Sequence, residues 1–238
     1  IHDNVREHFK EGTKSGNKAY ASPDDDELGH SLDKRISRVA TGAKPIALTE
    51  DMTKEEQHTR RNHNVALAIT QVASLRLACE KAHMTAIEYG QHIVTKKIRY
   101  GNCTEMACVG AYLTSKRTTQ HNSKMTPAWY ISIVATGGPG DHVFCMVGRG
   151  SEWEKVQEPP KSAEAAIVID PWANVCTTAA QYGTAFATKM NLWLGKGKRI
   201  STGGNNWEAP GEQYMNAFNG SDLVISNAWE AEISTLFA

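Results

Sequence analysis

The chain has 238 residues, of which 40% are hydrophobic and 22% are charged, close to the average for globular proteins. These values exclude a disordered, a collagen-like or a disulfide-dense chain. Lys plus Arg and Asp plus Glu each number 26, so the formal net charge is zero. A neutral chain gives no argument for nucleic acid or an acidic membrane as partner. No run of residues approaches the ~18 apolar residues of a membrane-spanning helix.

The N-terminal quarter of the chain is rich in charge and poor in apolar residues. Its first thirty residues contain no apolar core of a signal peptide. We predict that residues 1–52 form a polar, solvated extension that is partly ordered and contains one short helix. A targeting or substrate-docking arm is the alternative role. Residues 53–238 are expected to form the main domain.

A long helix is predicted to begin near Thr53, where the residue pattern changes and capping side chains occur. Apolar residues then recur at helical spacing and are interpreted as a stripe that faces the core. The stripe consists of Val65, Ile69, Val72, Leu75 and Cys79. Gly90 is expected to end or interrupt this helix.

A second helix is predicted after Tyr100-Gly101-Asn102, where glycine and asparagine interrupt the pattern. The residues that follow at helical spacing are Met106, Val109, Gly110 and Leu113. This pattern places Cys103 at or near the N-terminus of a helix.

Three strands are predicted next, at residues 129–136, 142–148 and 165–169. The first two form a hairpin across a glycine-rich turn, and Asp170-Pro171-Trp172 closes the third. The remaining residues, 173–238, mix short helical patterns with glycine-rich turns. Helices followed by an antiparallel sheet predict an α+β protein.

Cys103 is the first candidate for chemistry. The thiolate is the nucleophilic form of cysteine, and the positive end of a helix dipole stabilises it. The same helix end offers backbone N–H groups to an oxyanion that develops during acyl transfer. Most cysteines are small buried hydrophobic residues, so position alone does not make Cys103 catalytic.

His142 and Asp170 are residue types that a thiol nucleophile needs. His142 follows the glycine-rich turn at the start of a strand, where a neutral imidazole would accept the thiol proton. Asp170 follows the third strand, where a carboxylate would orient that imidazole. Singly, they are typical of a strand-edge histidine and a turn-initiating aspartate. Together with Cys103, they favour a thiol triad.

Three short motifs carry a resemblance to a known family: GNCTEMA around Cys103, GDHVFCMVG around His142 and VIDPWAN around Asp170. In this order they resemble the papain-like glutamine deamidase domains of bacterial toxins and secreted effectors, such as that of Pasteurella multocida toxin. The resemblance covers roughly residues 95–180. It implies a papain-like, or transglutaminase-like, fold for residues 53–238, in which the nucleophile helix packs on an antiparallel sheet.

The resemblance implies that Cys103 is the nucleophile, His142 the general base and acid, and Asp170 the orienting carboxylate. Asp141 is a competing acid, but neighbouring residues of a strand point to opposite faces. The segment EWEKVQEPPKS, residues 152–162, is interpreted as an insertion that shapes the substrate cleft.

The oxyanion-stabilising side chain is left open by the sequence. Papain-like proteases have a glutamine six residues before the cysteine, where this chain has Lys97. The alternatives are Asn102, Gln91 and Gln181. Asn102 and Trp172 are expected to line the oxyanion or substrate site, whereas Trp129 is assigned to the core.

The other cysteines are interpreted as structural thiols, because five cysteines without tight spacing argue against a disulfide framework. Cys108 and Cys145 are expected to point away from Cys103 and His142, which disfavours a zinc site made of these four residues. Glu105 is interpreted as a helix N-terminal charge rather than an acid catalyst.

The activity that the resemblance implies is hydrolysis of a glutamine side-chain amide in a host protein, without a cofactor or metal. The protein would be a secreted bacterial effector that acts in the host cytosol. Its partner would be a regulatory GTPase or a ubiquitin-pathway protein, not a nucleic acid. Papain-like proteolysis and transglutamination use the same triad and are alternatives. A catalytically inactive binding module is the alternative from another class.

Overall fold

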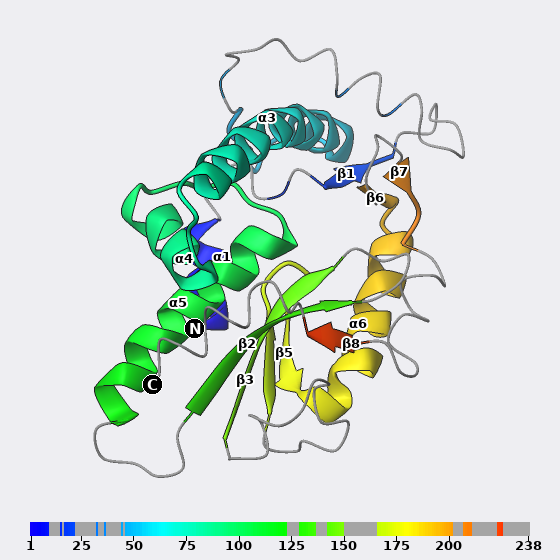
Figure 1. Ribbon diagram of the computed structural model, residues 1–238. Helices are drawn as coiled ribbons and strands as arrows, with labels where there is room; N and C mark the ends of the chain where they lie inside the picture. The colour runs from blue at the N-terminus through cyan, green and yellow to red at the C-terminus, as the bar shows by residue number, and fades with distance from the viewer. Residues whose placement is uncertain are drawn as a thin grey trace.

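Five helices and two antiparallel sheets make up the described part of the computed structural model (Figure 1). The structure describes residues 1–9, 15, 17–21, 32, 36, 44, 46–122, 129–136, 142–149, 166–201, 207–210 and 223–225. The helices are α1 (His2–His8), α3 (Lys54–Lys81), α4 (Ala86–Thr95), α5 (Cys103–Asn122) and α6 (Ala179–Leu194). The predicted α+β class is confirmed. None of the described helices combines the length and the apolar character needed to cross a bilayer.

The larger sheet has five strands, and all of its neighbouring pairs are antiparallel. In sheet order they are β5 (Val175–Thr178), β4 (Ile167–Asp170), β3 (Val143–Arg149), β2 (Trp129–Thr136) and β8 (Leu223–Ile225). The predicted hairpin is confirmed, since β2 and β3 pair from Trp129↔Arg149 to Ala135↔Val143. The predicted third strand corresponds to β4.

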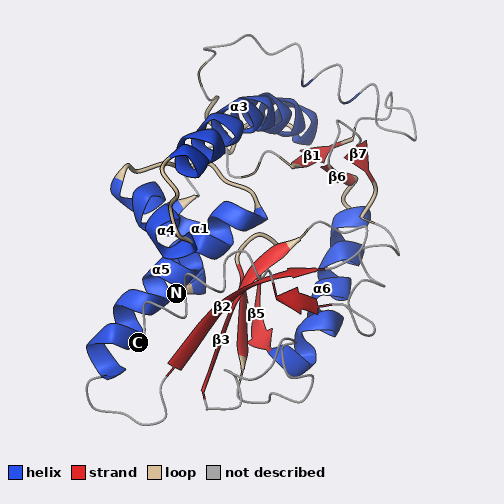
Figure 2. Ribbon diagram, in the orientation of Figure 1, coloured by secondary structure: helices blue, strands red, loops and turns tan. Residues whose placement is uncertain are grey.

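The larger sheet is covered by α5 on one face and by α6 on the other (Figure 2). Cys145 of β3 faces α5, because a side chain placed at Gly110 would lie 3.5 Å from its Cβ. The ring of the preceding Phe144 packs on Tyr182 of α6, with 4.6 Å between ring centroids. Neighbouring strand residues point to opposite faces, so the sheet has an apolar layer on each side.

The long predicted helix is confirmed in α3, which begins with a capping box between Thr53 and Glu56. Ile69 does not face the core as predicted, because it is 41% exposed. At 100° per residue it lies at the edge of the stripe, whose buried centre is formed by the other four residues. The helix ends at Lys81, and His83 then adopts a positive φ of 50°.

Gly90 lies in the middle of α4, so the prediction that it ends or interrupts the preceding helix is wrong. A Cβ atom at this position would lie 2.1 Å from the backbone oxygen of Cys108 and 2.6 Å from its carbonyl carbon. The glycine therefore permits a close crossing of α4 and α5. The sequence pattern could not distinguish a helix-breaking glycine from one required by a neighbouring helix.

Replacing Gly90 with alanine is expected to lower the free energy of unfolding by about 3 kcal/mol, because the two helix backbones must move apart. Chemical denaturation measures this change. Gly110→Ala is the matched control, since its new Cβ would lie 3.5 Å from Cys145, an ordinary contact. We expect that variant to change stability by less than about 1 kcal/mol. Equal losses in the two variants would contradict the proposed close crossing.

Part of the N-terminal segment is packed into the domain, whereas residues 44 and 46–50 are exposed. Val5 of α1 and the following Phe9 are buried in the same core cluster as Met106 of α5. The smaller sheet joins β1 (Lys18–Tyr20) to β6 (Lys198–Ser201), which pairs with β7 (Trp207–Glu208). A short segment can bury a few apolar residues without showing a periodic pattern, so the sequence did not reveal this packing.

The residues after 173 contain longer elements than the sequence suggested. The helix α6 has 16 residues and follows directly on β5. Its buried side chains are Tyr182, Phe186, Met190 and Trp193. They recur at helical spacing and would have supported a helix prediction.

Candidate active site

The structure brings Cys103, His142 and Asp170 together. Cys103 is the first residue of α5, as predicted, His142 directly precedes β3, and Asp170 is the last residue of β4. The imidazole Nε2 lies 2.9 Å from Asp170 Oδ2. The Cys103 thiol lies close enough to the same imidazole to raise its pKa. Because Nε2 faces the carboxylate, Nδ1 is the ring nitrogen that can exchange a proton with the thiol.

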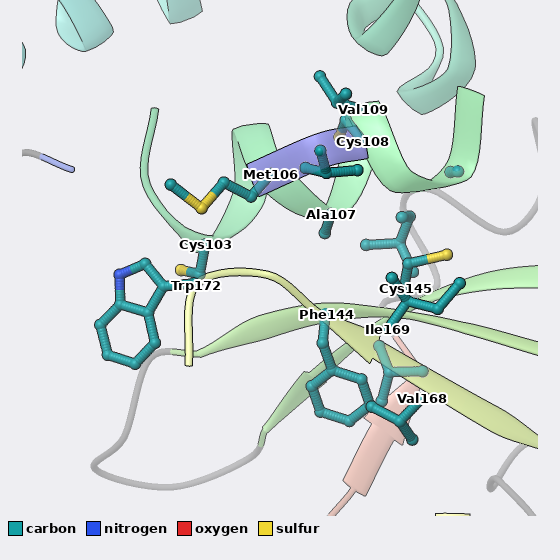
Figure 3. Close-up of a cluster of buried hydrophobic side chains, with 14 of the residues drawn as sticks. Cys103, Met106, Ala107, Cys108, Val109, Phe144, Cys145, Val168, Ile169 and Trp172 are labelled. Carbon is teal, nitrogen blue, oxygen red and sulfur yellow. The ribbon is translucent and has the colours of Figure 1, made fainter. Parts of the chain in front are cut away.

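The pairing of β3 with β4 explains why the histidine and the aspartate meet. The two strands are antiparallel, with Cys145 opposite Ile169. His142 precedes Cys145 and Asp170 follows Ile169, so both residues lie at the same end of the sheet. The N-terminus of α5 reaches this end, where Figure 3 shows Cys103 beside Trp172 and above the strands.

Asp170 is completely buried and accepts three hydrogen bonds. His142 Nε2 and the Tyr182 hydroxyl donate to Oδ2 at 2.9 and 2.8 Å, and the Ala173 N–H donates to Oδ1 at 3.0 Å. Burial alone would raise the pKa of Asp170, but the charge of His142 and these hydrogen bonds lower it. The carboxylate is therefore ionised and fixed in orientation. The sequence missed Tyr182 because the helix that carries it was not predicted.

His142 is 1% exposed, and aromatic rings surround it. The rings of Trp172 and Phe186 lie 4.7 and 5.2 Å from its own, between centroids. Burial alone would lower the pKa of His142, but the charge and hydrogen bond of Asp170, together with Cys103, raise it to about 9. At neutral pH the ring is therefore an imidazolium. This differs from the neutral imidazole expected from the sequence, which contains no measure of how close the carboxylate lies.

Trp172 and Asn102, the two expected site-lining residues, lie beside the triad and are connected by the N-terminal segment. Trp172 Nε1 donates to Asn17 Oδ1 at 2.8 Å and to Ser15 Oγ at 3.2 Å. The Ser15 hydroxyl also donates to Asn102 Oδ1 at 3.3 Å. Asn102 directly precedes Cys103. No sequence signal pointed to Ser15 or Asn17, because they lie in a polar segment without periodicity.

The two glutamines predicted as alternatives for the oxyanion site lie at the surface. Gln91 and Gln181 are exposed, and Gln181 accepts a hydrogen bond from Thr177. Of the three candidates for the oxyanion site, only Asn102 adjoins Cys103 in the chain. Asp141, the segment 152–162 and the side chain of Trp129 lie outside the described residues.

Glu105 holds the first turn of α5 in place. It is fully buried, and its carboxylate accepts the Asn102 N–H at 2.8 Å and the Tyr89 hydroxyl at 3.0 Å. Arg76 of α3 donates to both of its oxygens, at 2.7 and 3.1 Å. The interpretation of Glu105 as a helix N-terminal charge is confirmed. Its partners Arg76 and Tyr89 were not predicted, since they come from two other helices.

None of the five cysteines forms a disulfide bond. Burial raises the pKa of Cys108 well above its ordinary value and the pKa of Cys145 to about 12, which fits structural roles. Cys79 is also buried, whereas Cys176 is exposed. Among the described residues, no group of three or more His, Cys, Asp and Glu side chains is arranged to hold a metal ion.

Comparison of the chain with protein-family models, with curated proteins and with solved structures finds no match. The geometry of the site is therefore what indicates its chemistry. That geometry places a thiol at a helix N-terminus, an imidazole beside it and a buried carboxylate on the far side of the imidazole. This is the arrangement required for nucleophilic catalysis by cysteine.

Proposed function

We propose that this protein is a cysteine-dependent hydrolase that converts a glutamine of a host protein to glutamate. The observation that carries the proposal is the contact chain from Cys103 through His142 to Asp170, at the N-terminus of α5. The motif resemblance adds the substrate class and a papain-like fold. It also suggests a secreted bacterial effector that acts in the host cytosol on a regulatory GTPase or a ubiquitin-pathway protein.

In the proposed reaction, the Cys103 sulfur bonds to the carbonyl carbon of the glutamine carboxamide. The imidazolium of His142 beside the sulfur stabilises the attacking thiolate. The backbone N–H groups at the start of α5 stabilise the oxyanion, and the Asn102 side chain is the further candidate. The C–N bond then breaks as His142 gives its proton to the departing ammonia.

A thioester between Cys103 and the substrate remains after ammonia leaves. His142, now neutral, takes a proton from a water molecule that attacks the thioester carbonyl. The C–S bond breaks, the glutamate product leaves, and the thiolate–imidazolium pair is restored. Asp170 keeps Nε2 occupied throughout, so Nδ1 faces the reacting atoms.

The burial of the nucleophile favours a side-chain amide over a peptide bond as substrate. Cys103 is only 5% exposed, and Asn102 and Trp172 beside it are tied to Ser15. A glutamine side chain carries its amide at the end of a narrow, flexible stem. A scissile peptide bond would require an open cleft for the main chain on both sides.

Mass spectrometry of a eukaryotic cell lysate treated with the protein tests the proposal. We expect glutamine-to-glutamate conversion at one or a few sites with the wild type and none with Cys103→Ala. Both proteins should first be shown to unfold at the same temperature. New peptide termini would identify a protease, and isopeptide cross-links a transglutaminase. Identical lysates from the two proteins would contradict a catalytic role for Cys103.

A further inference from the structure

A pocket of about 510 Å³ lies next to the triad and is used by no step of the proposed reaction. Its walls come from α1, β1, α5, α6, β6 and the turn after β4. The N-terminal segment thus contributes to a concave surface beside the nucleophile. This position makes the pocket a candidate for binding another part of the substrate.

Trp172 separates the pocket from His142. Between ring centroids, Trp172 lies 4.7 Å from the imidazole and 5.0 Å from the edge-on ring of Trp193, which also lines the pocket. Met106, which also lines the pocket, is one helical turn after Cys103. Figure 3 shows Cys103, Met106 and Trp172 grouped at this end of α5. Met106 and Trp172 thus place the pocket next to Cys103.

The charged residues that line the pocket are mostly cationic. Four are basic, namely Arg6, Lys18, Lys189 and Lys198, and two are acidic, namely Asp3 and Glu7. The excess of positive charge is local, because the chain as a whole is neutral. A concave surface with an excess of one charge attracts ligands of the opposite charge.

Two of the lysines are held against the aromatic walls. The Lys18 ammonium donates to the Trp172 carbonyl oxygen at 2.8 Å and lies 4.7 Å from the centroid of that ring. The Lys198 ammonium lies 4.4 Å from the centroid of Trp193. These contacts fix cationic groups at the pocket in advance, which reduces the entropy lost when a ligand binds.

The other two basic side chains, those of Arg6 and Lys189, repel each other. Burial lowers the pKa of Lys189, and the nearby positive charge of Arg6 lowers it further. A carboxylate placed between the two side chains would relieve this repulsion. The apolar walls of Phe9, Met106 and Trp193 suit the methylene groups of a peptide side chain.

We propose that this pocket binds an acidic side chain that flanks the reactive glutamine in the protein substrate. The inference rests on the proposed function for the presence of a glutamine at Cys103. It adds a sequence preference, since the residue in the pocket and the glutamine must lie close together in the substrate. It also assigns a role to the N-terminal residues Arg6 and Lys18.

Fluorescence anisotropy of labelled peptides tests the proposal, with the Cys103→Ala chain used to prevent turnover. Each peptide contains one glutamine flanked by glutamate, alanine or lysine. We expect the glutamate-flanked peptide to bind at least about tenfold more tightly than the alanine-flanked one, with the advantage shrinking as salt is added. Introducing Arg6→Glu and Lys189→Glu together should remove this preference.

Lys81→Glu with Lys96→Glu is the matched control, because it changes the net charge equally at exposed positions that do not line the pocket. Equal binding of the three peptides, or equal losses in both double variants, would overturn the proposal. Displacement by pyrophosphate, with no difference among the peptides, would show a small-anion site instead. Because binding is measured without catalysis, a flank preference without glutamine conversion by the wild type would disprove the proposed function but would still support the cationic pocket as a site for an acidic side chain.

Discussion

Replacement of Asp170 by alanine is expected to lower the turnover number about 10⁴-fold, by analogy with the loss that substitution of the aspartate causes in a Ser-His-Asp triad. The substitution leaves the His142 ring without its partner at Nε2. It also removes the carboxylate that accepts hydrogen bonds from the buried Tyr182 hydroxyl and the Ala173 N–H. Steady-state kinetics on the identified substrate measure the effect. A loss of less than tenfold would show that Asp170 does not orient the histidine.

Asp170→Asn separates the charge from the hydrogen bond. The amide oxygen can still accept from His142, but the negative charge that contributes to raising the pKa of His142 to about 9 is gone. Activity that depends on the imidazolium should therefore decline at a lower pH in this variant than in the wild type. An unchanged alkaline limb of the pH–rate profile would contradict the assignment of that limb to His142.

The same pair makes the stability of the protein depend on pH. A histidine whose pKa rises from 6.5 to about 9 on folding stabilises the native state fully below pH 6.5. This contribution is lost as the pH rises through 9. The wild type should therefore lose stability over this interval, while Asp170→Asn should lose less.

Replacement of Arg76 by methionine is expected to lower the free energy of unfolding by about 2 kcal/mol. Loss of one partner of a buried ion pair costs about 3 to 5 kcal/mol, because a buried charge is left uncompensated. The Arg76 side chain is 42% exposed, so water already screens part of the attraction and the loss is smaller. Urea denaturation measures it, with Lys81→Met as the control on the same helix.

A double-mutant cycle tests whether Arg76 and Glu105 act as a pair. Because Glu105→Leu removes the charge that Arg76 compensates, the double variant should lose less stability than the two single losses added together. The kcat of Arg76→Met should also fall, since Glu105 fixes the turn that begins at Asn102. Additive losses of stability with an unchanged kcat would show that Arg76 and Glu105 do not act as a pair and do not position the site.

The sequence predicted those features that depend on local patterns. Short apolar runs bounded by turn residues located β2, β3 and β4, and the interruption at Gly101-Asn102 placed Cys103 at the start of α5. The three candidate triad residues followed from their positions at the ends of these elements. Local patterns extend over a few residues, which is enough to specify where an element begins.

Features that depend on contacts between distant segments were missed. The role of Gly90 is set by the backbone of Cys108, and Glu105 is paired with an arginine from another helix. The hydrogen bonds of Ser15 and Asn17 to Trp172 join residues more than 150 positions apart. Nothing in the neighbouring sequence of these residues indicates which distant atoms they meet.

The pairing of β1 with β6 affects when the protein first becomes active during its synthesis. Lys18 lies opposite Ile200, so β1 is synthesised long before the strand with which it pairs. Contacts between residues so far apart in sequence form slowly, because a long loop must close first. Until then Ser15, Asn17 and Lys18 have no fixed place beside Trp172. A nascent chain is thus expected to carry the triad sequence before it carries a complete site, which delays activity until β6 has been made.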